Sequence, residues 1–272
     1  MIDKTKALWN STTNELTKED IDWYNTIIEN PEKAFPIDVY PLLKTFLDDF
    51  HGKKICVPSS GDNTAAFGFH LLGAKVTSCD LSENQIRNAR QIAELYKWDI
   101  EFYCENSMNL QAVNNDEYDL IYTSNGVHVW INDLIAMYSG FYNKLKNGGY
   151  YIFFDTHPMI RPFDNSRADT VKISRHYKND IIVANEDGVP RHHWRAQDFV
   201  NAAVQSGFYL KHMEEFHSRP DDLDSHNYLN PESNPQHPNY GLDLFDWKVN
   251  PWAALPQCLC LCLQKLNSVY GK

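Results

Sequence analysis

Positive charge and long apolar runs are both scarce in this 272-residue chain. Its 36 aspartate and glutamate residues outnumber 25 lysines and arginines, which gives a formal net charge of −11. Because proteins bind nucleic acids largely by neutralising phosphates with basic side chains, we expect no nucleic-acid partner. No stretch approaches the roughly 20 apolar residues of a membrane span, and residues 1–20 contain no apolar segment. We therefore expect a cytoplasmic protein with no membrane contact.

The six cysteines form neither a disulfide framework nor a zinc motif. Cys258, Cys260 and Cys262 alternate within an apolar segment, so their side chains should share one face of a strand. A zinc site needs loops that gather its ligands around one point, and this regular alternation does not provide them. The other three cysteines lie in or at the end of short apolar runs. We expect no metal site and interpret the cysteines as small core residues.

Strand-like and helix-like segments alternate over about a hundred residues in the first half of the chain. Helical spacing of apolar residues begins after Ser82, which forms a capping-box pattern with Gln85, and recurs at 131–145, before an expected turn at 147–149. Right-handed crossovers convert such alternation into a doubly wound parallel sheet. Short apolar runs predict strands at 55–57, 76–79, 100–104, 118–122 and 150–154.

The segment 55–80 is the most informative part of the chain. It reads as a strand, a turn of small residues, a helix, and a second strand that ends in an acid. Ser59, Ser60 and Gly61 permit a tight turn and a close approach of the backbone to a ligand. Asp80 lies nineteen residues beyond Gly61, where its carboxylate can accept hydrogen bonds from both hydroxyls of a ribose. The segment therefore predicts half of a nucleotide-binding unit.

The order and spacing of these segments, over roughly residues 50–217, resemble the class I S-adenosylmethionine-dependent methyltransferases. In that family the first turn commonly reads as an acid, an apolar residue and then Gly-x-Gly-x-Gly, and here Gly61 alone is kept. Val57 replaces the acid, so we expect its contact with the methionine end of the cofactor to be absent or moved, for instance to Asp62. Asn63 tolerates a left-handed conformation and is expected to replace a glycine in the turn.

The resemblance also implies a fold and a cofactor site. The fold is an α/β sheet of seven mostly parallel strands in the order 3-2-1-4-5-7-6, with strand six starting at 207–208 and an antiparallel strand seven at 255–266. Asp80 would hold the ribose, and the Asn106 side-chain oxygen would accept from the adenine amino group. The expected cofactor-binding residues are Pro58, Ser59, Ser60, Gly61, Asn63, Asp80, Leu81, Asn106, Ser107, Met108, Asn125 and Gly126.

Domain organisation follows from the same resemblance. Residues 1–50 are expected to form an N-terminal helical cap and residues 51–272 the catalytic domain. Insertions at about 156–194 and 217–254 are expected to be lids over the acceptor, and the aromatic residues of the second insertion favour order. Three N-terminal aromatic residues are candidates to cover the cofactor or a partner: Trp9, Trp23 and Tyr24.

Methyl transfer from a sulfonium asks mainly for alignment of the acceptor and exclusion of water, because the methyl group is already electrophilic. An oxygen or ammonium acceptor also needs a base, and imidazole titrates near neutral pH. The expected catalytic residues are His128 and His193, with His157 and His192 as further candidates. Acceptor contacts are expected from His128, Trp130 and Trp194.

The favoured function is methylation of a small-molecule acceptor by a monomer or homodimer, with S-adenosylmethionine as the cofactor and S-adenosylhomocysteine as the product. An NAD-dependent oxidoreductase is one alternative, since Asp80 would equally hold the ribose of NAD, although the turn lacks G-x-G-x-x-G. A non-catalytic cofactor-binding protein is another, because the first turn is atypical. No residue pattern identifies the acceptor atom.

Overall fold

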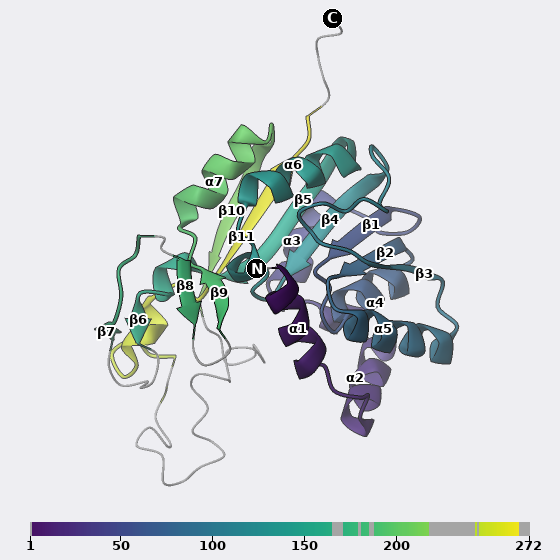
Figure 1. The fold of residues 1–272 in the computed structure, drawn as a ribbon, viewed down its shortest axis with the longest axis horizontal. Coiled ribbons are helices and arrows are strands. Elements are labelled where there is room, and N and C mark those ends of the chain that lie inside the picture. The colour runs from purple at the N-terminus through teal and green to yellow at the C-terminus, as the bar shows by residue number, and fades with distance from the viewer. Residues whose placement is uncertain are drawn as a thin grey trace, which may run out of the picture.

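A seven-stranded sheet forms the middle layer of the computed structural model, which describes residues 2–164, 171–178, 181–184, 188–217, 243 and 245–266. The strands are β1 (Lys54–Pro58), β2 (Lys75–Asp80), β3 (Ile100–Cys104), β4 (Tyr118–Ser124), β5 (Leu145–Thr156), β10 (Tyr209–Phe216) and β11 (Cys258–Gln264). Their order is β3-β2-β1-β4-β5-β11-β10, with β3 and β10 at the two edges (Figure 1). β11 runs antiparallel to the other six strands, which all run in one direction. The predicted order 3-2-1-4-5-7-6 is confirmed.

Both faces of the sheet are buried, as the short apolar runs predict. Ile55 and Val57 on β1 belong to the core on one face, and Cys56 between them belongs to the core on the other. Cys260 and Cys262 lie on one face of β11 and are fully buried. The interpretation of the cysteines as core residues is confirmed for four of them, whereas Cys258 is half-buried and Cys104, at the end of the edge strand β3, is exposed.

Helices cover the two faces of the sheet in separate groups. The first face packs against α3 (Val39–Phe46), α4 (Thr64–Leu71) and α5 (Glu83–Tyr96), whereas α6 (Leu134–Lys144) and α7 (Ala196–Gln205) cover the second. The remaining N-terminal elements are α1 (Ile2–Thr12), α2 (Lys18–Glu29) and the 3₁₀ helix η1 (Pro31–Ala34). This layered arrangement leaves the carboxyl ends of the parallel strands free to form a site.

A close contact joins η1 to α4. A Cβ placed on Gly68 of α4 would lie 2.4 Å from the Cβ of Ala34, so only glycine permits this approach. Phe35 follows η1 directly and its ring packs against Phe69 of α4, with ring centroids 4.7 Å apart. The N-terminal segment is therefore fixed against the helix that follows β1.

The prediction of a turn at 147–149 is wrong, because these residues lie within β5. Tyr118 of β4 pairs with Leu145, but Leu120 pairs with Tyr150, so the extra residues form an irregular bulge. Lys265 closes it: its carbonyl accepts from the Gly148 N–H at 2.7 Å, and its own N–H donates to the Gly149 carbonyl at 2.9 Å. Pairing with the chain beyond β11 thus overrides the local Asn-Gly-Gly turn signal.

Two short hairpins lie in the expected insertion 156–194. One pairs β6 (Phe163–Asp164) with β7 (Lys172–Ile173), and the other pairs β8 (Ile181–Ala184) with β9 (Val189–His192). β9 packs against α1 and against the 3₁₀ helix η2 (His128–Trp130). The expected lid at 217–254 falls largely outside the described residues. Within the described part of the chain, no helix is long and apolar enough to cross a membrane.

Candidate functional site

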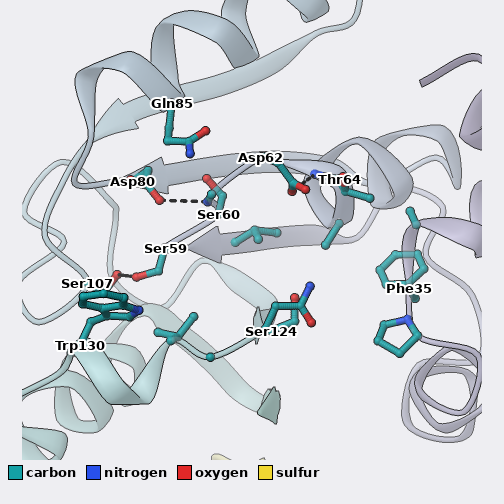
Figure 2. Close-up of a pocket in the computed structure, with 18 of the residues that line it drawn as sticks. Phe35, Ser59, Ser60, Asp62, Thr64, Asp80, Gln85, Ser107, Ser124 and Trp130 are labelled. Carbon is teal, nitrogen blue, oxygen red and sulfur yellow. Dashed lines mark hydrogen bonds between the residues drawn. The ribbon is translucent and has the colours of Figure 1, made fainter. Parts of the chain in front are cut away.

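A cavity of about 1310 Å³ lies at the carboxyl ends of β1, β2 and β4. Its described walls come from the β1–α4 turn, the ends of β2 and β3, the β4–α6 connection and the N-terminal segment. Figure 2 shows Asp80, Ser107 and Trp130 toward one end of the cavity, and Phe35 at the other. Ser124 lies between them. The cavity is thus an elongated space with two chemically different ends.

The β1–α4 turn is built from residues with positive φ. Ser59 has a φ of 52°, Gly61 of 54° and Asn63 of 66°. The Asn63 amide donates to the Gly61 carbonyl at 2.8 Å, and the Ser78 hydroxyl donates to the Asn63 side-chain oxygen. The prediction that Asn63 adopts the left-handed conformation is confirmed, and these hydrogen bonds explain how the turn forms with a single glycine.

Asp80 is held at the end of β2 by two backbone donors. Its Oδ2 accepts from the Gly61 N–H at 2.9 Å, and its Oδ1 accepts from the Ser82 N–H at 2.8 Å. Burial raises the pKa of Asp80, and the Ser82 and Gly61 N–H groups oppose that rise. Because a carboxylate has about four acceptor sites, Asp80 keeps further acceptor capacity at the cavity wall.

The capping pattern at Ser82 is only half formed. The Ser82 hydroxyl accepts from the Gln85 N–H at 3.2 Å, as expected, but the Ser82 N–H goes to Asp80 instead of the Gln85 side chain. Gln85 lines the cavity near Asp80 (Figure 2). Because Gln85 fits a helix-capping pattern, the sequence did not indicate that it also lines the cavity.

The segment after β3 also lines the cavity, through Asn106, Ser107 and Met108. The Asn106 Oδ1 accepts from the Met108 N–H at 3.0 Å, so this N–H is already used within the turn. The Ser107 hydroxyl lies 2.5 Å from the Ser59 hydroxyl, which ties this turn to the β1–α4 turn. Asn106 keeps one acceptor site and its amide N–H groups for a ligand.

The β4–α6 connection forms the opposite wall. Asn125 and Gly126 are consecutive left-handed residues, with φ of 62° and 83°, and both line the cavity. Trp130 follows, and the Arg191 guanidinium carbon lies 3.8 Å from its ring centroid. Trp9 of α1 meets the same ring edge-on, with centroids 5.2 Å apart. Segments far apart in sequence thus fix Trp130 at the wall.

His128 lies behind this wall and does not line the cavity. It is 1% exposed, its Nδ1 lies 2.7 Å from the Asp155 Oδ2, and its Nε2 lies 2.9 Å from the Tyr138 hydroxyl. Burial raises the pKa of Asp155, but hydrogen bonding and charge interaction with His128 outweigh it and leave the pKa lowered. The His128 N–H also donates to Asp155. This geometry supports anchoring of the connection to β5 rather than contact with an acceptor.

Of the other expected catalytic and acceptor residues, Trp130 lines the cavity and the rest lie outside its walls. Burial, then Arg161 and Arg175, lower the pKa of His193 to about 4. The Trp194 indole N–H donates to the Ile131 carbonyl at 2.9 Å, so it supports the wall from behind. His157 binds Glu215 at 2.9 Å. Pro58, Asn63 and His192 are buried away from the cavity.

The N-terminal segment supplies walls that the motifs do not identify. Trp9 and Trp23 both line the cavity, as the covering role expected of them requires, whereas Tyr24 is buried beside it. The Trp23 indole N–H lies 3.3 Å from the Thr64 hydroxyl at the start of α4. Other wall residues that sequence reasoning missed are Phe35, Pro36, Ile37, Tyr40 and Pro41. Their only sequence signal is a run of prolines and aromatics at 35–41, which extends from the end of η1 into α3.

The end of the cavity near Asp80 fits an adenosine-containing cofactor. Gly61 and Gly126 both have positive φ, and a Cβ on either would meet nothing within 4 Å, so the backbone there borders open space. Asp80 offers acceptor capacity for ribose hydroxyls, and Asn106 offers both donors and an acceptor for a base edge. Polar groups and open backbone thus occur together, as such a cofactor requires.

Comparisons with known proteins agree with this geometry. Residues 59–149 match the methyltransferase domain family. A curated relative, the uncharacterized methyltransferase YbaJ of Bacillus subtilis (strain 168), is 25% identical over 183 residues, which are 66% of this chain and 67% of the relative. The family match at 59–149 includes the β1–α4 turn, Asp80 and the β4–α6 connection.

Solved structures share the fold. An S-adenosylmethionine-dependent methyltransferase from Mesorhizobium loti has a TM-score of 0.61 and 22% identity, and the alignment covers 83% of this chain and 96% of that one. Geranyl diphosphate C-methyltransferase from Streptomyces coelicolor A3(2), solved with S-adenosyl-L-homocysteine, has a TM-score of 0.55 and 12% identity, with 82% and 78% covered. Residues 59–149 are thus similar to a methyltransferase domain, and the chain shares its fold with S-adenosylmethionine-dependent methyltransferases of known structure.

Proposed function

We propose that the protein transfers the methyl group of S-adenosylmethionine to a small-molecule acceptor by in-line displacement inside the cavity. The observation that carries this proposal is the size of the cavity, about 1310 Å³. A single ligand usually occupies a pocket of roughly 300–1,000 Å³. Space therefore remains beside the cofactor for a second small molecule, and a macromolecular acceptor is not needed to explain the site.

The proposed cofactor contacts are the predicted residues that line the cavity. Asp80 holds the ribose, and Asn106 faces the adenine edge. Asn63 acts through the turn and not by contact, since it is 1% exposed and bonded to Gly61. Gln85 is added to the set because it lines the wall near Asp80. The other contacting residues are Ser59, Ser60, Gly61, Leu81, Ser107, Met108, Asn125 and Gly126.

When bound, S-adenosylmethionine supplies an electrophilic methyl group on a sulfonium. The protein's share is to align the acceptor and exclude water, and the aromatic side chains of Trp9, Trp23 and Trp130 at the walls serve this purpose. The described walls contain no histidine. Where an acceptor must lose a proton, the carboxylates of Glu32 and Asp62 are the wall groups able to accept it.

A labelling experiment tests the proposal. The protein is incubated with S-adenosylmethionine carrying a radioactive methyl group, together with a cell extract separated into small molecules, proteins and nucleic acids. We expect transfer of label to the small-molecule fraction only. Label in the protein or nucleic-acid fraction would contradict the small-molecule acceptor.

Cofactor choice is measured on the same preparation by thermal unfolding. Ligand at about a hundred times its dissociation constant stabilises the folded state by roughly 2.7 kcal/mol. We expect a shift of the unfolding temperature with S-adenosylmethionine and S-adenosylhomocysteine and none with NAD.

Four further expectations stay predictions: a cytoplasmic location, a monomer or homodimer, the absence of a nucleic-acid partner, and the division into domains at residue 50.

A further inference from the structure

We propose that the acceptor binds in the end of the cavity farthest from Asp80, and that it is a non-anionic molecule with an aromatic or aliphatic body. This end, called the aromatic chamber, is lined by Phe35, Pro36, Ile37, Tyr40 and Pro41. The inference rests on the proposed function, because it assigns the space that the cofactor leaves. It names the acceptor by its chemistry: an uncharged or cationic group is accepted, and a phosphate, sulfonate or carboxylate is rejected.

The position of the chamber separates it from the cofactor contacts. Phe35 lies at the end of the cavity opposite Asp80 and Trp130 (Figure 2). The wall between them carries Ser124 from the end of β4, Asp62 from the β1–α4 turn and Thr64 from the start of α4 (Figure 2). An acceptor in the chamber would therefore lie alongside the cofactor in the same cavity, without displacing the groups that hold the ribose.

The chamber is rigid and apolar. The Phe35 and Tyr40 rings stack with centroids 5.9 Å apart, and Phe35 also meets Tyr122 edge-on at 6.0 Å. Phe35 is 5% exposed, and its neighbour Ala34 is pressed against Gly68. Aromatic walls held in this way favour the burial of apolar surface and ring contacts with little loss of side-chain entropy.

The charged side chains of the cavity walls determine which acceptors can bind in the chamber. The charged side chains on the described cavity walls are Glu32, Lys33, Asp62 and Asp80, which are three acids and one base. No arginine belongs to these walls, so no bidentate partner for a phosphate or carboxylate is present there. Lys33 is the single cation on these walls, and Glu32 and Asp62 outnumber it even when Asp80 at the far end is left aside, so an anion would meet more negative than positive charge. The same field is favourable or neutral for amines and uncharged groups.

A pair of fluorescent probes tests this charge preference without knowledge of the natural acceptor. N-phenyl-1-naphthylamine and 8-anilino-1-naphthalenesulfonate share one aromatic body, and only the second carries a sulfonate. Each is titrated into the protein saturated with S-adenosylhomocysteine, and its emission is recorded. We expect the uncharged probe to bind at least about tenfold more tightly, a difference of about 1.4 kcal/mol.

Two positions locate the binding. Ile37 is 46% exposed and lines the chamber, whereas Ile135 on α6 is 44% exposed and lies outside the cavity walls. Because both are exposed, neither substitution removes core packing. Ile37→Glu should weaken the uncharged probe about fivefold or more, and Ile37→Lys should strengthen the sulfonate probe by a similar factor. Ile135→Glu and Ile135→Lys should leave both affinities unchanged, and all four variants should keep the affinity for S-adenosylhomocysteine.

Each other outcome has a defined meaning. Equal affinities for the two probes, failure of the uncharged probe to bind the loaded protein, or identical behaviour of the Ile37 and Ile135 variants would each overturn the inference. Failure of the unmodified protein to bind S-adenosylhomocysteine would instead count against the proposed function. The two proposals therefore fail on different measurements.

Discussion

The two ends of the cavity are built by different means. Near Asp80, hydrogen bonds to backbone N–H groups and left-handed turn residues set the positions of the polar groups. At the aromatic chamber, ring packing and the close contact between Ala34 and Gly68 fix the wall. The first construction specifies polar contacts to one cofactor, whereas the second specifies only shape and apolarity. A shared cofactor end and a changeable acceptor end are thus compatible with one fold.

The largest effect is expected at the cofactor end. Asp80→Ala should weaken the binding of S-adenosylhomocysteine by about 2–4 kcal/mol, because a charge-assisted pair of hydrogen bonds is lost. Isothermal titration calorimetry measures this change. Asp133→Ala is the matched control, since Asp133 also accepts a backbone N–H, from Ala136 at 2.9 Å, but lies outside the cavity walls. Unchanged affinity in Asp80→Ala would refute the ribose assignment.

Behind the cofactor end, the buried pair His128 and Asp155 should act through stability. His128→Leu leaves the Asp155 carboxylate buried without its main partner, so we expect the free energy of unfolding to fall by about 2–4 kcal/mol. Urea unfolding measures it. Tyr138→Phe removes only the contact to the other ring nitrogen and should cost about 1 kcal/mol. An equal loss in both variants would show that the Asp155 contact does not dominate.

At the aromatic chamber, Gly68→Ala tests whether the two ends of the cavity are independent. The new Cβ would lie 2.4 Å from Ala34 and 3.0 Å from Phe35, so η1 must shift. We expect a loss of about 1–3 kcal/mol in unfolding free energy, as overpacking usually causes, and weaker binding of the uncharged probe. Calorimetry should show nearly unchanged affinity for S-adenosylhomocysteine. Equal losses for probe and cofactor would mean that the two ends are not independent.

A smaller effect is expected at Asn106. Asn106→Leu removes the side-chain acceptor and donors that we propose for the adenine edge, so discrimination between the adenosine and inosine forms of S-adenosylhomocysteine should fall by about 1 kcal/mol. Competition binding with both forms measures the ratio. An equal loss of affinity for the two forms would indicate that Asn106 only shapes its turn, through its bond to Met108.

A pH dependence of stability is expected at a histidine outside the cavity walls. Burial, with Arg161 and Arg175, lowers the pKa of His193 from 6.5 to about 4, so the unfolded chain binds this proton more readily. Stability is therefore lost as the pH falls from about 6.5 toward 4, and is constant above that window. His193→Gln should flatten this dependence in thermal unfolding. A profile unchanged by His193→Gln would contradict the assignment.

The sequence predicted the sheet order, the left-handed Asn63 and many of the residues that line the cavity near Asp80, because those features depend on local chemistry. A strand followed by small residues, and an acid at the end of the next strand, leave few alternatives. Gln85 was missed because its cap pattern has a second explanation. The capping box is only half formed because the Ser82 N–H donates to Asp80, and helix propensity does not predict this tertiary contact.

The aromatic chamber and the positions of the histidines could not be predicted from such local patterns. His128 was expected at the substrate because of its place after β4, but a one-residue step along the chain turns its side chain toward Asp155 while Val127 faces the cavity. Phe35 and Tyr40 carry no motif, since apolar walls need only volume and shape. Their role depends on how η1 packs against α4, which is a long-range contact.

The contact between Gly68 and Ala34 has a consequence for evolution. Two positions that touch through small side chains must change together, because a larger residue at either one is tolerated only if the other can give way. Relatives that retain both small residues should retain the same acceptor chamber, and relatives that have lost them should have rebuilt it. A pair of residues outside every cofactor motif thus becomes a marker for sorting homologues by acceptor.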